Sequence, residues 1–151
     1  MRKFLKWIGI SLATVVGAIL VLVAVLVFLG GRKLSATRTV AVDAVAVPAE
    51  PAAVERGAHL ARTRCVFCHG DDLGGKKFID DASFMIVNAP NLTRGEGGLA
   101  NTYADDATWV RAIRHGVKPD GRPAMVMPSE DYNRFTDPDL AALVAYTRSL
   151  A

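Results

Sequence analysis

The sequence predicts an all-α protein, a small domain of three or more helices preceded by a single N-terminal transmembrane helix. The run from Ile8 to Leu29 is 22 residues long and contains no charged side chain. Beyond it, apolar residues recur at the spacing of amphipathic helices, and no segment shows the sustained alternation of a strand. The third observation is a Cys-x-x-Cys-His motif at residues 65–69.

The apolar run is long enough to cross a membrane as a helix. At about 1.5 Å per residue it spans about 33 Å, and a hydrocarbon core is about 30 Å thick. Trp7 precedes the run and Gly30-Gly31-Arg32-Lys33 follows it, as suits a helix held at both interfaces. A cleaved secretory signal is the alternative, but its apolar core is usually only about 7 to 15 residues long. The nearest small-x-small candidate, Leu34-Ser35-Ala36, has a large first residue. We therefore predict an uncleaved membrane anchor over residues 1–33.

The formal net charge of +3 is unevenly distributed along the chain. Six of the 18 Lys and Arg lie in residues 1–38, which contain no acidic residue. The rest of the chain contains the remaining 12 Lys and Arg and all 15 Asp and Glu, so its net charge is −3. Three cations lie on each side of the apolar run, which leaves the positive-inside count tied. A mildly acidic domain has no basic stripe to neutralise phosphates, so we expect no nucleic-acid partner.

Residues 34–53 are predicted to form an extended linker. The segment Val45-Ala46-Val47-Pro48-Ala49-Glu50-Pro51 is punctuated by proline and rich in small and β-branched residues. A short edge strand around Val40 to Val47 is the alternative. The first helix of the domain is expected from Val54 to Arg64, directly before the motif. The stretch from Lys76 to Asn101 lacks sustained periodicity and is expected to form loops.

Two further helices are expected in the C-terminal half. Asp105 or Asp106 can cap the first, which ends at His115-Gly116, where glycine is favoured. Thr136-Asp137-Pro138-Asp139 can begin the second, which continues to Leu150. The first of these helices carries an apolar stripe of Trp109, Val110 and Ile113.

Cys65-Val66-Phe67-Cys68-His69 is the attachment pattern of a c-type haem. Each thiol adds to a vinyl group of the porphyrin, and the imidazole of His69 becomes the proximal iron ligand. These are the only 2 cysteines, so a structural zinc site would lack its usual four Cys or His ligands. A thioredoxin-like redox pair would need a βαβ context that the flanking residues do not supply. We predict one covalent haem c.

The order of five short motifs resembles that of a class I (mono-haem, His/Met) cytochrome c domain. The resemblance covers about residues 53–151, and it is closest to bacterial membrane-anchored members and to haem-bearing subunits of periplasmic dehydrogenases. The motifs are Cys65-Val66-Phe67-Cys68-His69, Ala89-Pro90-Asn91-Leu92-Thr93, Trp109 to His115-Gly116-Val117, Val126-Met127-Pro128-Ser129 and Asp139 to Tyr146. We therefore expect residues 54–151 to form a cytochrome c domain.

This resemblance implies how the domain packs and how the iron is held. The first and last helices would cross near a haem edge, with Gly57 allowing close approach and Leu143 and Tyr146 filling the contact. The Pro90 carbonyl would accept the hydrogen bond that a neutral His69 ligand needs at its second ring nitrogen. Met127 would be the distal ligand, because a thioether opposite histidine raises the reduction potential and fills the site that oxygen would take. The candidates that stay open for this position are Met125, Met85, His115 and His59, together with the absence of any sixth protein ligand.

Two other residues are candidates for the haem environment. Trp109 either packs on the porphyrin edge or donates to a propionate, and an ordinary core tryptophan is the alternative. Arg64, beside Cys65, would neutralise a propionate, whereas an exposed arginine on a helix is the default expectation.

The function that the resemblance implies is that of a membrane-tethered electron carrier and not of an enzyme. Its haem domain would lie on the periplasmic or outer face of the cell membrane. Its partners would be redox proteins, such as a dehydrogenase, a quinol oxidase complex or a terminal oxidase. The alternatives are the electron-transfer subunit of a periplasmic dehydrogenase and a gas or redox sensor; the sensor is disfavoured because no signalling domain accompanies the motif.

Overall fold

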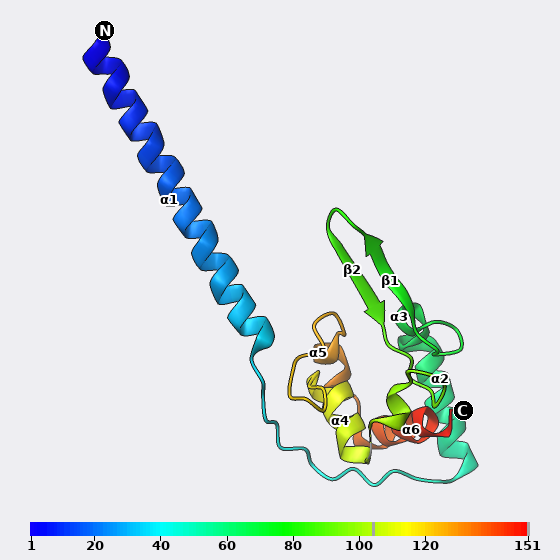
Figure 1. The fold of residues 1–151 in the computed structure, drawn as a ribbon. Coiled ribbons are helices and arrows are strands. Elements are labelled where there is room, and N and C mark those ends of the chain that lie inside the picture. The colour runs from blue at the N-terminus through cyan, green and yellow to red at the C-terminus, as the bar shows by residue number, and fades with distance from the viewer. Residues whose placement is uncertain (104, 151) are drawn as a thin grey trace. The chain divides into compact units, whose positions relative to one another are not determined.

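The computed structural model describes residues 1–103 and 105–150, which divide into two units (Figure 1). The first unit, Met1–Thr37, consists of helix α1 (Arg2–Ser35) and its flanking residues. The second unit begins at Arg38. Position 151, which ends the predicted domain, lies outside the described residues.

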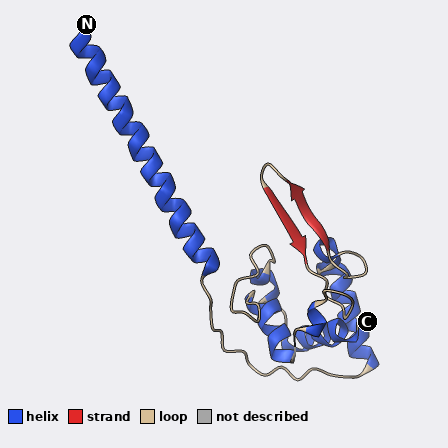
Figure 2. Cartoon of the chain, viewed as in Figure 1, coloured by secondary structure: helices blue, strands red, loops and turns tan. Residues whose placement is uncertain are grey.

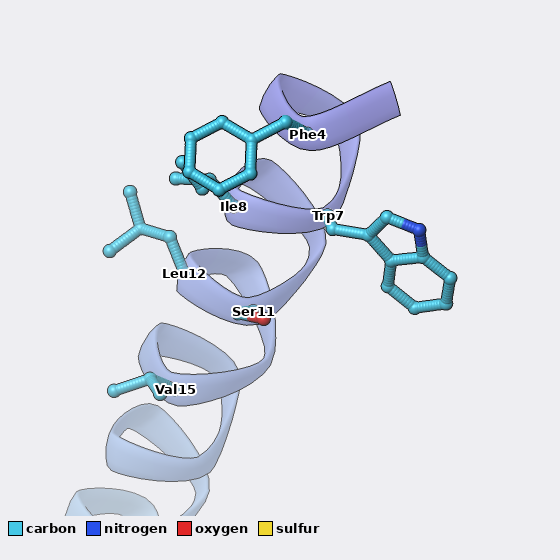
Figure 3. Close-up of a pocket in the computed structure, with 6 residues that line it drawn as sticks. All are labelled: Phe4, Trp7, Ile8, Ser11, Leu12 and Val15. Carbon is cyan, nitrogen blue, oxygen red and sulfur yellow. The ribbon is translucent and has the colours of Figure 1, made fainter. Parts of the chain in front are cut away.

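Helix α1 is long and apolar enough to cross a membrane. It is 34 residues long, contains the predicted span and buries none of its side chains within the protein. Figure 3 shows side chains of its first turns, which project outward from the helix: Phe4, Trp7, Ile8, Ser11, Leu12 and Val15. A membrane anchor and a signal sequence both have this composition. In either case the apolar side chains of α1 would be surrounded by lipid and not by water.

The second unit contains five further helices, a two-stranded sheet and one short 3-10 helix among its described residues (Figure 2). In chain order they are α2 (Pro51–Arg64), α3 (Val66–His69), β1 (Lys76–Asp81), β2 (Met85–Ala89), η1 (Leu99–Asn101), α4 (Asp106–His115), α5 (Ser129–Tyr132) and α6 (Asp137–Ser149). Helix α2 begins at Pro51, three residues before the expected Val54, because proline suits the first turn of a helix, where no backbone donor is needed.

Helices α2 and α6 cross in close backbone contact at Gly57. A Cβ atom added at Gly57 of α2 would lie 2.0 Å from the Ala142 carbonyl oxygen and 2.7 Å from the Tyr146 Cβ. Only a residue without a side chain fits this contact. Leu143 is buried beside it, and Tyr146 packs against the same core. The expected close crossing at Gly57 is confirmed.

The hydrophobic core joins this helix pair to α4 and to the loops around it. Its largest buried members are Leu73, Leu92, Tyr103, Trp109, Val110, Ile113, Leu140, Leu143 and Val144. The loop residues Leu73 and Leu92 belong to this set, so the segments on both sides of the β1–β2 hairpin are fixed to the core.

The helix ends expected in the C-terminal half are confirmed. The Asp105 carboxylate accepts from the Thr108 backbone N–H at 2.7 Å, so Asp105 and not Asp106 caps α4. Gly116 ends that helix in the left-handed conformation, with φ of 62°. The Thr136 hydroxyl accepts from the Asp139 N–H at 3.3 Å and caps α6.

The expectation of an all-α domain is wrong between Lys76 and Ala89. Strands β1 and β2 form an antiparallel hairpin there, with Ile79 opposite Val87 and an irregularity between Lys77 and Ile79. The hairpin projects from the helices of the domain (Figure 1), and none of its residues belongs to the core. With neither face fully buried, its sequence has no reason to alternate between polar and apolar residues, which is why the periodicity did not reveal it.

Residues 36–50 form neither helix nor strand, so the alternative of an edge strand around Val40 to Val47 is not realised. Part of this segment nevertheless lies against the domain. The Arg38 N–H donates to the Gly121 carbonyl at 2.8 Å, and three valines pack against the core: Val42, Val45 and Val47. Burial of these side chains explains why a segment with the composition of a linker is partly held.

The substitution Gly57→Ala tests the helix crossing. The added methyl group would overlap backbone atoms of α6, so we expect the free energy of unfolding to fall by about 1–3 kcal/mol. This is the opposite of the gain that alanine brings at an open helix position. Denaturant unfolding of the detergent-solubilised protein measures the effect. Ala52→Val, at an exposed position of α2, is the control, and equal stability of both variants would refute the close contact.

Candidate haem-binding site

The two cysteines and the histidine are brought together by one short turn at the end of α2. Cys65 is the C-cap of α2, and its N–H donates to the Ala61 carbonyl at 2.8 Å. Its own carbonyl accepts from the Cys68 N–H at 3.1 Å and from the His69 N–H at 2.9 Å. Both thiols are free and half-buried. All three side chains that a c-type haem requires therefore come from a single hydrogen-bonded turn.

The imidazole of His69 is oriented by a hydrogen bond to the Pro90 carbonyl. Nδ1 lies 2.9 Å from that oxygen, and because a carbonyl only accepts, Nδ1 carries the proton and Nε2 is left with a free lone pair. Burial lowers the pKa of His69, against the opposing effect of the Pro90 hydrogen bond. Both the tautomer and the neutral state are those that an iron ligand needs.

The environment of Cys65 is that of a protected thiol. Burial, followed by the nearby charge of Cys68, raises the pKa of Cys65 to about 11. Reactive cysteines of redox enzymes have lowered pKa values, because the thiolate is the nucleophile. Cys65 therefore lacks the lowered pKa that is typical of a reactive thiol.

The segment after Met127 is tied to the end of α2, directly before the candidate attachment turn, residues 65–69. The Tyr132 hydroxyl, one short helix after Met127, donates to the Arg64 carbonyl at 2.9 Å. Met127 is half-buried and packs against the core, whereas Met125 is 63% exposed. A ligand that must exclude water from the iron suits the half-buried position.

The other candidates for the distal position lie in different surroundings. Met85 lies at the start of β2, where its side chain is exposed. His59 is exposed on α2, and His115 is the last residue of α4, where a histidine suits the negative end of the helix dipole.

Trp109 and Arg64 contribute to the domain in different ways. Trp109 is 2% exposed and packs in the core against Tyr103, with 4.8 Å between the ring centroids. The side chain of Arg64 is exposed, and its backbone carbonyl receives the hydrogen bond from Tyr132. The sequence did not single out two arginines of α4, Arg111 and Arg114, each of which has a buried Nε with no hydrogen-bond partner among the described residues.

The residues present fit a bound haem c. The donor set combines two thiols, an imidazole with a free Nε2 and a half-buried thioether, which is the set that a His/Met haem needs. The orphaned Nε of Arg111 can pair with a propionate. Among the described residues after α1, every large exposed hydrophobic side chain lies in the attachment turn, the β1–β2 hairpin or the Met127 loop. They are Phe67, Phe84, Met85, Ile86, Met125 and Val126.

Sequence reasoning missed Tyr132 and Arg111. Tyr132 is a single tyrosine in a polar segment, and its partner is a backbone carbonyl, which leaves no sequence signal. Arg111 could have been noticed as an arginine between apolar residues of the α4 stripe, where a half-buried side chain needs polar partners; one of its Nη atoms donates to the Thr108 hydroxyl at 3.3 Å.

Comparison with known proteins identifies the family. Residues 52–146 match the model of the family described as cytochrome c oxidase, cbb3-type, subunit III. The chain belongs to this family. The expected resemblance to a cytochrome c domain is thereby confirmed, and with it the electron-transfer role and the haem that such a domain implies.

One curated relative is itself described as the cytochrome subunit of a dehydrogenase. The fructose dehydrogenase cytochrome subunit of Gluconobacter japonicus is 30% identical over 135 residues. The alignment covers 76% of this chain but 27% of that protein, so the chain spans about a quarter of the length of this relative. No solved structure matches the chain significantly.

The substitution Tyr132→Phe tests the tie between the Met127 loop and the attachment turn. Loss of one hydrogen bond should lower the free energy of unfolding by about 0.5–1.5 kcal/mol. Tyr146→Phe is the matched control, because the Tyr146 hydroxyl has no protein hydrogen bond within residues 1–103 and 105–150. The comparison is made by denaturant unfolding, and equal midpoints for the two variants would contradict the proposed tie.

Proposed function

We propose that this protein is a membrane-tethered c-type cytochrome that passes single electrons through one covalently bound haem with His69 and Met127 as axial ligands. The observation that carries the proposal is the arrangement at His69. Its Nδ1 is engaged by Pro90 and its Nε2 is free. The turn that carries His69 directly follows Arg64, whose carbonyl accepts from Tyr132 at the end of α5, the short helix after Met127. Axial ligands that the protein already holds in position keep the reorganisation energy of electron transfer small.

Each residue has a distinct task in this proposal. Cys65 and Cys68 hold the porphyrin through thioether bonds, and His69 ligates the iron through Nε2. Pro90 fixes the imidazole tautomer, and its hydrogen bond makes the ligand more basic. Trp109 and Arg64 belong to the haem environment, Trp109 as packing and Arg64 as charge. When bound, the haem supplies a one-electron couple, so the chain needs no substrate pocket and is not itself an enzyme.

The membrane supplies the second part of the proposal. Residues 1–33 act as the anchor through α1, residues 34–53 as the linker and residues 54–151 as the cytochrome c domain. The length and apolar surface of α1 support the anchor. The haem domain is placed on the periplasmic or outer face of the cell membrane, where it meets a dehydrogenase, a quinol oxidase complex or a terminal oxidase.

A second candidate function is that of a fixed subunit in a periplasmic dehydrogenase complex with a separate catalytic chain. Similarity to the cytochrome subunit of a fructose dehydrogenase favours this candidate. Affinity purification from gently solubilised membranes separates the two. A stoichiometric large partner would establish the subunit, and isolation of the cytochrome alone would establish the free carrier.

The distal ligand is tested by two methionine variants. In Met127→Ala the weak long-wavelength band of methionine–iron ligation should disappear, and the reduced protein should bind carbon monoxide at the vacated position. The reduction potential should fall by on the order of 0.1–0.3 V, because loss of the thioether favours the ferric state. Visible spectra and a redox titration measure these changes.

Met125→Ala is the control for this experiment, because its side chain is the exposed alternative in the same loop. The band and the potential should be unchanged in this variant. If the band survives in Met127→Ala and disappears in Met125→Ala, the assignment of the distal ligand is reversed.

A further inference from the structure

The residues that flank the β1–β2 hairpin on both sides form hydrogen bonds with the same histidine, His69. Immediately before β1, the Gly75 N–H donates to the His69 carbonyl at 2.8 Å. Immediately after β2, the Pro90 carbonyl accepts from His69 Nδ1 at 2.9 Å. One end of the hairpin therefore holds the backbone of His69, and the other end holds its ring.

The two ends of the hairpin are in direct backbone contact at Gly75. A Cβ atom added there would lie 2.7 Å from the Asn91 nitrogen, 2.8 Å from the Ala89 carbonyl oxygen and 2.9 Å from the Pro90 carbonyl carbon. All three neighbours are backbone atoms, which cannot rotate away as a side chain does. Gly75 also has φ of +85°, a conformation that side chains disfavour.

The position of Pro90 does not depend on burial of the hairpin strands. The strands lie outside the core, whereas Leu73 and Leu92, just beyond the hairpin ends, are buried members of it. The Leu92 N–H donates to the Leu73 carbonyl at 2.8 Å. Gly75 and Pro90 therefore belong to two segments that are held in the core by Leu73 and Leu92, and both segments contact His69.

We propose that Gly75 is a positioning residue for the iron ligand, because the close approach that it permits sets the hydrogen bond between Pro90 and His69. The inference rests on the proposed function, in which His69 ligates the haem iron. A shorter or longer distance at this contact changes how strongly Pro90 draws on the Nδ1 proton. The strength of this hydrogen bond sets the basicity of the imidazole, and the basicity in turn affects the reduction potential.

The substitution Gly75→Ala tests this role in the full-length holoprotein. The methyl group should push the Pro90 peptide away from His69 and weaken the hydrogen bond. Exchange of the Nδ1 proton with deuterated solvent, followed by NMR of the reduced protein, should accelerate roughly tenfold or more. The reduction potential should rise, because a less basic imidazole stabilises the ferric state less. The methyl signal of the methionine ligand should stay in place.

Gly97→Ala is the matched control. Gly97 also has a positive φ, +71°, but a Cβ atom there would meet nothing within 4 Å. It therefore carries the same kind of backbone strain without the contact, and the His69 signals should match those of the parent protein. Ala89→Gly provides a second variant that adds no atoms. It loosens the other side of the contact and should also accelerate exchange of the Nδ1 proton.

Three results would overturn the inference. Exchange in Gly75→Ala and Ala89→Gly that is no faster than in Gly97→Ala would show that the contact does not position His69. Simultaneous changes at the histidine and methionine ligands would show general loosening of the domain. Absence of covalent haem from the parent protein would overturn both this inference and the proposed function, so the two failures are distinguishable.

Discussion

The hydrogen bond between His69 Nδ1 and the Pro90 carbonyl is the interaction on which the rest of the site depends. It leaves Nε2 with a free lone pair that can bind a metal ion, and burial of the ring lowers the pKa of the imidazole and favours its neutral form. In the proposed function the cysteines of the motif would fix the position of a porphyrin, but only an oriented imidazole would define the axis along which a second ligand can bind. The Met127 loop, tied to the same turn through Tyr132, can supply that ligand.

The helices hold the turn at residues 65–69 in place through the elements packed around it. The crossing at Gly57 packs α2 against α6, and α2 delivers Cys65 directly at its C-terminus. From the other side, α4 and the loops around Leu73 and Leu92 complete the core. The small core is compatible with a domain that gains part of its apolar interior from a prosthetic group, and the exposed hydrophobic residues gather in the segments that surround the motif.

Strong local signals allowed much of this architecture to be predicted. The caps of α4 and α6 depend on residue types with narrow preferences, whereas the close approach at Gly57 and the Pro90 acceptor for His69 were expected from the resemblance to cytochrome c domains. Each of these contacts is present. The hairpin could not be predicted, because Lys76 to Asp81 buries neither face and so carries no period of two. The tie between Tyr132 and Arg64 was equally hidden, since a backbone carbonyl is an acceptor in every residue.

The central claim is that one haem is joined covalently to the only 2 cysteines of the chain. The most direct test is the intact mass of the denatured, purified protein, because denaturation removes a haem that is merely bound. The account predicts the mass of the polypeptide plus one haem, with no thiol left to alkylate. A mass equal to that of the polypeptide alone, with both cysteines alkylated, would contradict it.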